Sequence, residues 1–108
     1  QLISMPMAGA TAPVTITGAV VQHTAECMSG LAICQLAGEG APIVWGGSPA
    51  VFDMREGTTP MGAVGTWMID VSDTQVGKAL GLPTHATVDR YQLRSPPGGA
   101  GYASRGLQ

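Results

Sequence analysis

Residues 41–49 read Ala-Pro-Ile-Val-Trp-Gly-Gly-Ser-Pro, a short apolar run closed by glycine, serine and proline. An apolar run of this length that stops at turn-forming residues is typical of a buried strand. Two helix-forming stretches flank it, one over residues 14–36 and one that begins near Pro60. The sequence therefore predicts a strand at the centre of the chain, which ends at the glycines and lies between two helices.

The N-terminal part of the chain has the same order of features. Residues 2–7 form another short apolar run, and a turn of small residues follows them. Thr11 is the expected helix cap, and Pro13 suits a first helical turn because its missing N–H has no partner there. The helix expected over residues 14–36 is rich in Ala, Val, Leu and Met, and Gly38 is its expected end.

A second helix and a third strand follow the central strand. A threonine before Pro60 is the expected cap, with the proline in the first turn. The acidic residues Asp70 and Asp73 are assigned to the polar face of this helix, which ends at Gly81, and residues 82–88 predict the strand. The apolar face recurs at helical spacing through Met61, Val64, Met68 and Val71.

This order of strand, helix, strand, helix, strand indicates an α/β fold of βαβαβ units with parallel strands. Parallel strands joined by helices are the building block of open α/β sheets and of (β/α)8 barrels. A barrel has eight βα units and about 250 residues, and this chain, with about two such units and one more strand, supplies about a quarter of one. We expect residues 1–88 to form a partial (β/α) barrel segment and residues 89–108 to form an irregular tail rich in proline and glycine.

The composition excludes two classes of protein. Of 108 residues, 44% are hydrophobic and 11% charged, and the net charge is −2. Intrinsic disorder needs low hydrophobicity and high net charge, and a nucleic-acid binder needs a basic surface. A typical soluble domain carries about 25% charged residues, so this chain has fewer than half as many charges with which to form a hydrophilic surface. We therefore expect other copies of the chain, or the rest of a larger fold, to cover its apolar faces.

The sequence also predicts the compartment. There is no run of about 18 apolar residues and no basic region ahead of an N-terminal apolar stretch, so we expect neither a membrane span nor a signal peptide. Cys27 and Cys34 lie about two helical turns apart, too far for a disulfide. Two buried thiols in a reducing cytoplasm are the expected state.

Candidate site residues lie where the predicted strands end, because ligands bind at the carboxyl ends of parallel strands. His85 is the candidate catalytic group, since an imidazole there can donate or accept a proton near neutral pH. A structural role for His85 carries equal weight. The candidate substrate-binding residues are Gly9, Thr11, Gly46, Gly47, Ser48, Asp53 and Arg55.

Several of these features have a structural alternative. Gly46 and Gly47 lack the full spacing of a dinucleotide-binding loop, and a tight turn explains them as well. The side chains of Asp53 and Arg55 can simply pair. His23 and Glu26 share a helix face at i, i+3, but no third ligand accompanies them, so a structural pair is favoured over a metal site. No metal is expected.

An ordered series of motifs resembles the trimethylamine methyltransferase (MttB-like) family. These motifs are Pro6-Met-Ala-Gly-Ala-Thr-Ala-Pro-Val-Thr15, Val21-Gln-His-Thr-Ala-Glu26, Gly40-Ala-Pro-Ile-Val44, Phe52-Asp-Met-Arg55, Pro60-Met-Gly-Ala63 and Gly81-Leu-Pro-Thr-His-Ala86. The resemblance covers roughly residues 3–86. After Ala86 the sequence departs from the family pattern, and the tail looks unrelated to it.

The resemblance implies an interior portion of a (β/α)8 barrel that moves a methyl group from a tertiary or quaternary amine to a corrinoid. The corrinoid is carried by a partner protein, so no cofactor is expected on this chain itself. A fragment of this size is expected to be inactive in methyl transfer on its own. Two other readings stay open: a self-associating α/β module without catalysis, and a small stand-alone hydrolase or binding protein that uses His85.

Overall fold

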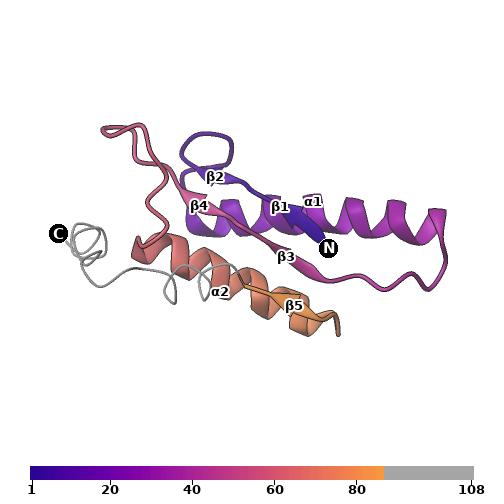
Figure 1. The fold of residues 1–108 in the computed structure, drawn as a ribbon. Coiled ribbons are helices and arrows are strands. Elements are labelled where there is room, and N and C mark those ends of the chain that lie inside the picture. The colour runs from indigo at the N-terminus through magenta and orange to yellow at the C-terminus, as the bar shows by residue number, and fades with distance from the viewer. Residues whose placement is uncertain (87–108) are drawn as a thin grey trace, which may run out of the picture.

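A computed structural model describes residues 1–86, in which short strands alternate with two helices (Figure 1). The two helices contact each other. The elements, in chain order, are β1 (Leu2–Ser4), β2 (Met7–Ala8), α1 (Ile16–Ala37), β3 (Trp45–Gly47), β4 (Ala50–Val51), α2 (Val64–Ala79) and β5 (Thr84–His85).

Every strand pair in the described segment is parallel. One sheet has the order β1-β3-β5, so the three strands of this sheet lie side by side in the order in which they occur along the chain. Trp45 pairs with both Leu2 and Thr84. A second ladder joins β2 to β4. The α/β class and the parallel pairing expected from the sequence are therefore confirmed.

The β1–β3 and β2–β4 ladders are parts of one continuous pairing between the same two extended segments. Hydrogen bonds continue from β1–β3 to β2–β4 through Ser48 N–H, which donates to the Ser4 carbonyl at 3.0 Å, and Ala50 N–H, which donates to the Pro6 carbonyl at 3.1 Å. Pro6 and Pro49 have no N–H to donate, which breaks the regular ladder between the two parts. The carboxyl ends of these extended paths therefore lie at β2 and β4.

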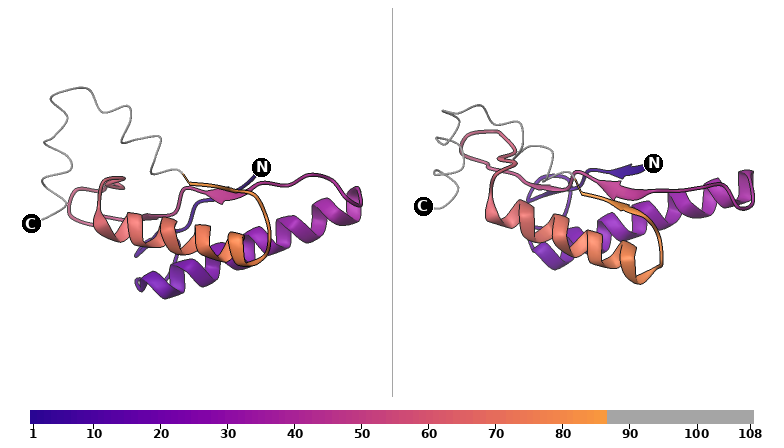
Figure 2. Two further views of the ribbon diagram at one scale, coloured as in Figure 1. Left: turned by 90° about the horizontal axis from the view of Figure 1, so that it is seen from below. Right: turned by 60° about the horizontal axis from the view of Figure 1, so that its bottom comes forward.

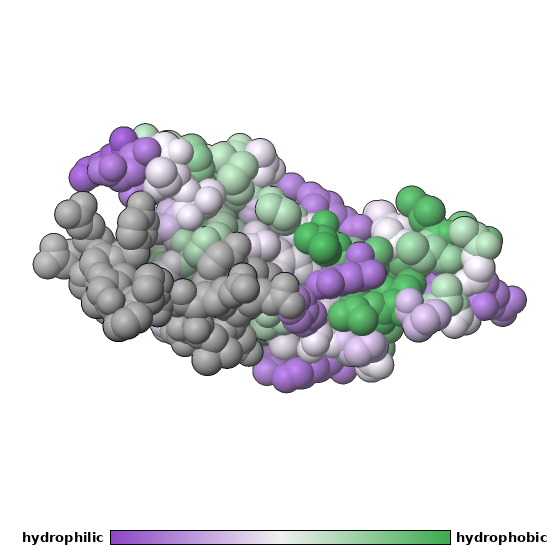
Figure 3. All heavy atoms as spheres, viewed as in Figure 1, coloured by the Kyte–Doolittle hydropathy of each residue, from purple (hydrophilic) through white to green (hydrophobic). Residues whose placement is uncertain are grey.

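Both helices lie on one side of the strands (Figure 2). The helix side of β3 carries Trp45, which is 1% exposed and lies against Gly77 of α2. On the other side of the sheet, Ile3 and Met5 are each 62% exposed. On the face seen in Figure 3, apolar patches alternate with hydrophilic atoms. The sheet is thus covered on one face and open on the other within residues 1–86.

The helix boundaries differ from the expected ones for identifiable reasons. Thr15 rather than Thr11 is the N-cap of α1, and its side chain accepts from Gly18 N–H at 3.1 Å. The Thr11 hydroxyl instead accepts from Met7 N–H at 3.0 Å and holds the preceding turn. Gly38 ends α1 as expected, with its N–H bonded to the Cys34 carbonyl.

The start of α2 also lies later than expected. Its N-cap is Ala63, and Pro60 precedes the helix instead of occupying its first turn. The Pro60 carbonyl accepts hydrogen bonds from Ala63 N–H and the Thr66 hydroxyl, so the proline belongs to a turn that the helix follows. Gly81, with φ of +73°, follows the helix as expected.

The expected strand over residues 82–88 is confirmed only at β5, and its last two positions, like the tail over residues 89–108, lie outside the described residues. In residues 1–86 no helix combines the length and the hydropathy that a membrane crossing requires.

The contact between α2 and β3 yields a stability prediction. A Cβ at Gly77 would lie 2.7 Å from Trp45 Cδ1 and 2.6 Å from Thr84 Cγ2, and the buried indole has no room to move. We expect Gly77→Ala to lower the free energy of unfolding by about 1–3 kcal/mol despite the higher helix propensity of alanine. Urea unfolding followed by circular dichroism measures this change.

Gly30→Ala is the matched control for this prediction. A Cβ at Gly30 meets Leu2 Cδ2, the far end of a flexible side chain, at 2.8 Å. Its effect is expected to be neutral or stabilising by up to about 1 kcal/mol, as helix propensity dictates. Equal destabilisation by both substitutions would contradict this account of the α2–β3 contact.

Candidate functional site

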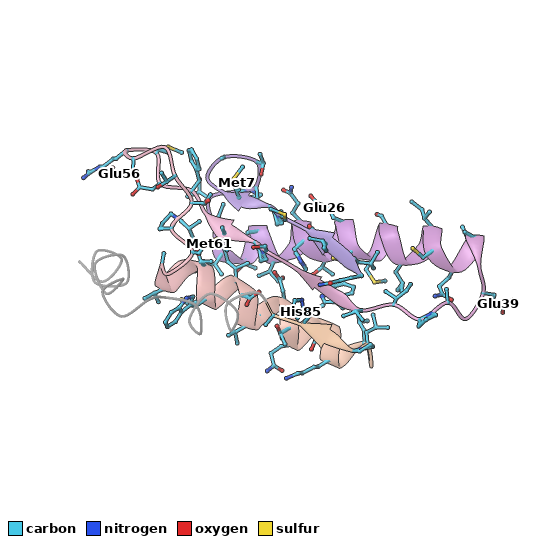
Figure 4. All side chains as sticks on the ribbon, viewed as in Figure 1. Met7, Glu26, Glu39, Glu56, Met61 and His85 are labelled. Atoms are coloured by element: carbon cyan, nitrogen blue, oxygen red, sulfur yellow. The ribbon has the colours of Figure 1, made fainter. Side chains whose placement is uncertain are left out.

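The carboxyl ends of β2 and β4 bring two loops together. Phe52 N–H donates to the Ala8 carbonyl at 3.0 Å, and Gly9, with φ of +90°, lies against Met54, whose Cε would be 3.7 Å from a Cβ there. In Figure 4, Met7 and Glu56 mark this end of the molecule, and His85 lies well away from them. The candidate residue Gly9 therefore lies beside the loop that follows β4, and Thr11 belongs to the turn that follows β2.

Asp53 organises the loop after β4. Its Oδ1 accepts from Arg55 N–H at 2.8 Å and from Glu56 N–H at 3.4 Å, and its own N–H donates to the Thr58 carbonyl at 2.9 Å. Asp53 thus contacts the backbone of Arg55, and the side chain of Arg55 is exposed. This turn presents the guanidinium at the carboxyl end of the sheet.

The sequence predicted that Gly46 and Gly47 follow the end of the strand. Both lie within β3 instead. The extended path continues through Ser48 to β4 before the loop begins. Small residues are needed here because neighbours approach both faces. A Cβ at Gly46 would lie 2.8 Å from the His85 carbonyl, and one at Gly47 would overlap the His23 ring.

His85 faces the open side of the sheet. It pairs with Gly46 across the ladder, and its Nδ1 accepts from the side-chain amide of Gln1 at 2.9 Å. Asp53 lies seven positions after Gly46, which is about 23 Å along an extended chain. The candidate residues therefore form two groups, one at the carboxyl-end loops and one around His85 near the amino end of β3.

A buried polar cluster between the helices and β3 was missed by sequence reasoning. His23 of α1 is fully buried, and its Nδ1 lies 3.4 Å from Oδ1 of Asp73 on α2, which is 4% exposed. The Trp45 ring meets the His23 ring edge-on, with centroids 6.1 Å apart. Cys27 completes the cluster and donates from Sγ to the Gly46 carbonyl at 3.6 Å.

Asp70 and Asp73 are both buried, so their assignment to a polar helix face was wrong. The tertiary contact between α1 and α2 decides this, and the spacing within α2 alone contains no sign of it. The i, i+4 spacing of His23 and Cys27 on the covered side of α1 was the only available signal.

Burial sets the protonation of this cluster. Desolvation lowers the pKa of His23, and it raises the pKa of Asp73 to about 7 with a further contribution from the Asp70 charge. Desolvation also raises the pKa of Cys27 to about 11, assisted by Asp73 and Glu26. The Cys27 thiol is therefore protonated at neutral pH and is a poor nucleophile.

The side chains of His23 and Glu26 contact different partners although both residues lie on α1. Glu26 accepts hydrogen bonds from the Ser4 hydroxyl and the Gln22 amide, which lower its pKa in that order of size. His23 turns to Asp73. The geometry thus favours structural roles for both, with α1 tied to β1 through Glu26 and to α2 through His23. Cys27 and Cys34 are free thiols.

The raised pKa of Asp73 predicts a pH dependence of stability. Its ordinary pKa is 3.8, so between about pH 4 and 7 the folded chain keeps a proton that the unfolded chain has lost. The stability gained from holding this proton on Asp73 is therefore fully present below about pH 4 and is lost as the pH rises to about 7. We expect Asp73→Asn to remove this loss, so that the variant exceeds the parent by about 1 kcal/mol or more near pH 7.5.

Urea unfolding at several pH values from 5 to 8 measures the difference. Glu39→Gln, which removes an exposed carboxylate from the turn after α1, is the control. An unchanged slope in Asp73→Asn, with His23 intact, would contradict the assignment.

Comparison with known proteins bears on this architecture. The family model "Trimethylamine methyltransferase (MTTB)" matches residues 1–94. Trimethylamine methyltransferase MttB of Methanosarcina barkeri is 32% identical over 102 residues, 94% of this chain and 21% of that protein. MttB of Desulfitobacterium hafniense is 32% identical over 84 residues, 78% of this chain and 17% of that protein. A glycine betaine methyltransferase of D. hafniense is 26% identical over 103 residues, 95% and 22% of the two chains.

The chain spans about a fifth of the length of the curated relatives it matches. The family match reaches residue 94 and the longer alignments cover 102 and 103 residues, so the resemblance extends past Ala86, where the quoted motifs end. The chain belongs to the trimethylamine methyltransferase family.

Proposed function

We propose that this chain is an interior segment of a (β/α)8 barrel methyltransferase, consisting of two βα units and the next strand. The arrangement of the sheet carries the proposal. Its strands run parallel in chain order, β1-β3-β5, and both helices lie on the same face. In a barrel each strand neighbours the next and all helices lie outside, whereas a doubly wound sheet carries helices on both faces.

In this arrangement the open face of the sheet is the barrel interior. Ile3 and Met5, which are exposed here, would be covered by strands from the rest of the barrel. The free edges of β1 and β5 would pair with those strands, since an unpaired edge favours association. The chain is proposed to be inactive in methyl transfer alone, because most of the barrel mouth lies outside its sequence.

The proposed reaction moves a methyl group from a trimethylamine-type or betaine-type amine to a corrinoid held by a partner protein. The names of the relatives, trimethylamine methyltransferase and glycine betaine methyltransferase, support a methylated amine as the substrate class. The loops after β2 and β4 would form part of the mouth, with Gly9, Thr11, Asp53 and Arg55 as substrate-binding residues. Gly46, Gly47 and Ser48 are proposed to keep β3 narrow beside the interior.

His85 is proposed to donate or accept a proton within the barrel, at a position separate from the mouth loops. It faces the open side of the sheet, and the Gln1 amide fixes its orientation by donating to Nδ1. This hydrogen bond leaves Nε2 as the position that carries the exchangeable proton in the neutral ring.

Two further properties are proposed. The protein is proposed to act in the cytoplasm, and copies of the chain are proposed to self-associate.

Product analysis tests the proposal. The 108-residue chain, incubated with a reduced corrinoid protein and either trimethylamine or glycine betaine, is expected to release no dimethylamine or dimethylglycine. A family member of full length that carries this segment is expected to release one of them. Turnover by the chain alone would contradict the need for the remaining barrel.

The role of His85 is tested in the same full-length context. His85→Ala is expected to lower kcat at least tenfold and to leave the melting temperature within a few degrees, whereas His85→Gln tests whether hydrogen bonding alone suffices. Ile3→Ala, on the same face of the sheet, is the control for packing. Unchanged kcat in His85→Ala would remove this residue from the proposed site.

A further inference from the structure

The side of α1 that faces away from the sheet carries a continuous apolar stripe. The sheet side of the helix is defined by Glu26, which bonds Ser4, and by Gly30, which lies against Leu2. On the opposite side, at helical spacing, five residues are all exposed, and we call them the outer stripe: Val21, Ala25, Met28, Ala32 and Leu36. It extends for about 22 Å along the helix.

The outer stripe is strongly exposed and has no charge. Val21 is 63% and Leu36 89% exposed. Glu26 is the only acidic residue of α1, and the helix has no lysine or arginine. A helix that is apolar all round is normally buried on all sides, and helices on the solvent side of a fold usually carry charges there. The outer stripe is therefore suited to a contact with another protein surface.

Four of the five residues in the outer stripe are placed symmetrically about its midpoint, and the fifth, Met28, lies next to that midpoint. The midpoint lies between Met28 and Ser29, which is also exposed. Ala25 and Ala32 are equally distant from this midpoint, and so are Val21 and Leu36. When two copies of α1 lie antiparallel about a two-fold axis through this point, the alanines of one copy lie level with the alanines of the other. The larger side chains of Val21 and Leu36 meet in the same way toward the ends.

This placement suits an isologous contact, because each side of a two-fold interface must complement itself. The alanines permit close approach of the two helices on either side of the centre, where Met28 lies, and the larger side chains of Val21 and Leu36 lie toward the ends. Since the stripe carries no charge, its own copy brings no like-charge repulsion.

We propose that the outer stripe of α1 is a homodimer interface, in which two copies pack antiparallel about a two-fold axis between Met28 and Ser29. A helix pair of this length buries roughly 800–1,000 Å² in total, near the lower limit for a specific interface, so the association is weak and depends on concentration. The proposal specifies the self-association suggested above, and it is independent of the methyl-transfer reaction.

Light scattering behind a sizing column tests the interface. At high concentration the parent chain, of 11.0 kDa, is expected to approach twice its monomer mass. Met28→Glu places two carboxylates near the axis, and we expect it to raise the dimer dissociation constant at least tenfold. Ile33→Glu, on the same helix but outside the stripe and 67% exposed, is the matched control and is expected to leave the mass unchanged. Circular dichroism verifies that both variants are helical.

Cross-linking tests the register and does not depend on a destabilising charge. In a Cys34→Ser background, a mixture of Ala25→Cys and Ala32→Cys chains is expected to form disulfide-linked heterodimers under mild oxidation. Each variant alone places its thiols about 10 Å apart along the axis and is expected to remain unlinked.

Three outcomes would overturn the interface. A parent chain that is monomeric at all concentrations would refute the interface and self-association together and would leave the stripe to another segment of a longer chain. A dimer that persists in Met28→Glu would retain self-association but place it elsewhere, for instance at the sheet edges. Equal cross-linking in the single variants and the mixture would refute the antiparallel register. None of these results alters the test of methyl transfer.

Discussion

The contacts of both helices with β3 hold the described fold together. α2 comes close enough at Gly77 to touch the Trp45 ring, and α1 places the His23 ring over Gly47. Neither approach leaves room for a Cβ at the glycine, because the neighbouring atoms already fill that space. β3 also pairs with β1 on one side and β5 on the other. The position of each remaining element is set by its contact with this central strand or with a helix that covers it.

The same layer contains polar groups that most cores exclude. His23 and Asp73 lie between two helices and the sheet, away from water and beside the Cys27 thiol. A buried carboxylate is costly when ionised, and its pKa of about 7 shows that a proton relieves part of this cost near neutral pH. Nδ1 of His23 lies 3.4 Å from Oδ1 of Asp73, and neither carboxylate oxygen of Asp73 makes a hydrogen bond within the described residues, so this contact brings α1 and α2 together without relieving the cost of burying the carboxylate.

The small core explains why so much apolar surface is left over. Ala8, Ala19 and Ile69 form the central apolar cluster, and two of these three side chains are single methyl groups. Ile3 and Met5 on the sheet and Leu36 on α1 are exposed instead. The open sheet face belongs, in our proposal, to the interior of a barrel, and the outer stripe belongs to a second copy of the chain. The scarcity of charge in the sequence has the same origin as these two uncovered faces.

The class and order of the elements could be predicted from the sequence because they depend on local patterns. The apolar runs and the helix ends at Gly38 and Gly81 are local signals of this kind. The strand path from Trp45 to Val51 could not be predicted, because Gly46, Gly47 and Pro49 signal a turn locally and pair only through a neighbouring strand. Likewise, the burial of Asp73 depends on α1, some fifty residues earlier in the chain.

Nuclear Overhauser effects between assigned protons measure the central claim most directly, namely that both helices cover one face of a parallel sheet centred on β3. The account predicts strong cross-peaks from the His23 ring to the Gly47 α-protons and from the Trp45 ring to the Gly77 α-protons. It also predicts none from either helix to the side chain of Ile3 on the open face. Cross-peaks that join α1 or α2 to Ile3 would place a helix on the other face of the sheet and would contradict the barrel segment.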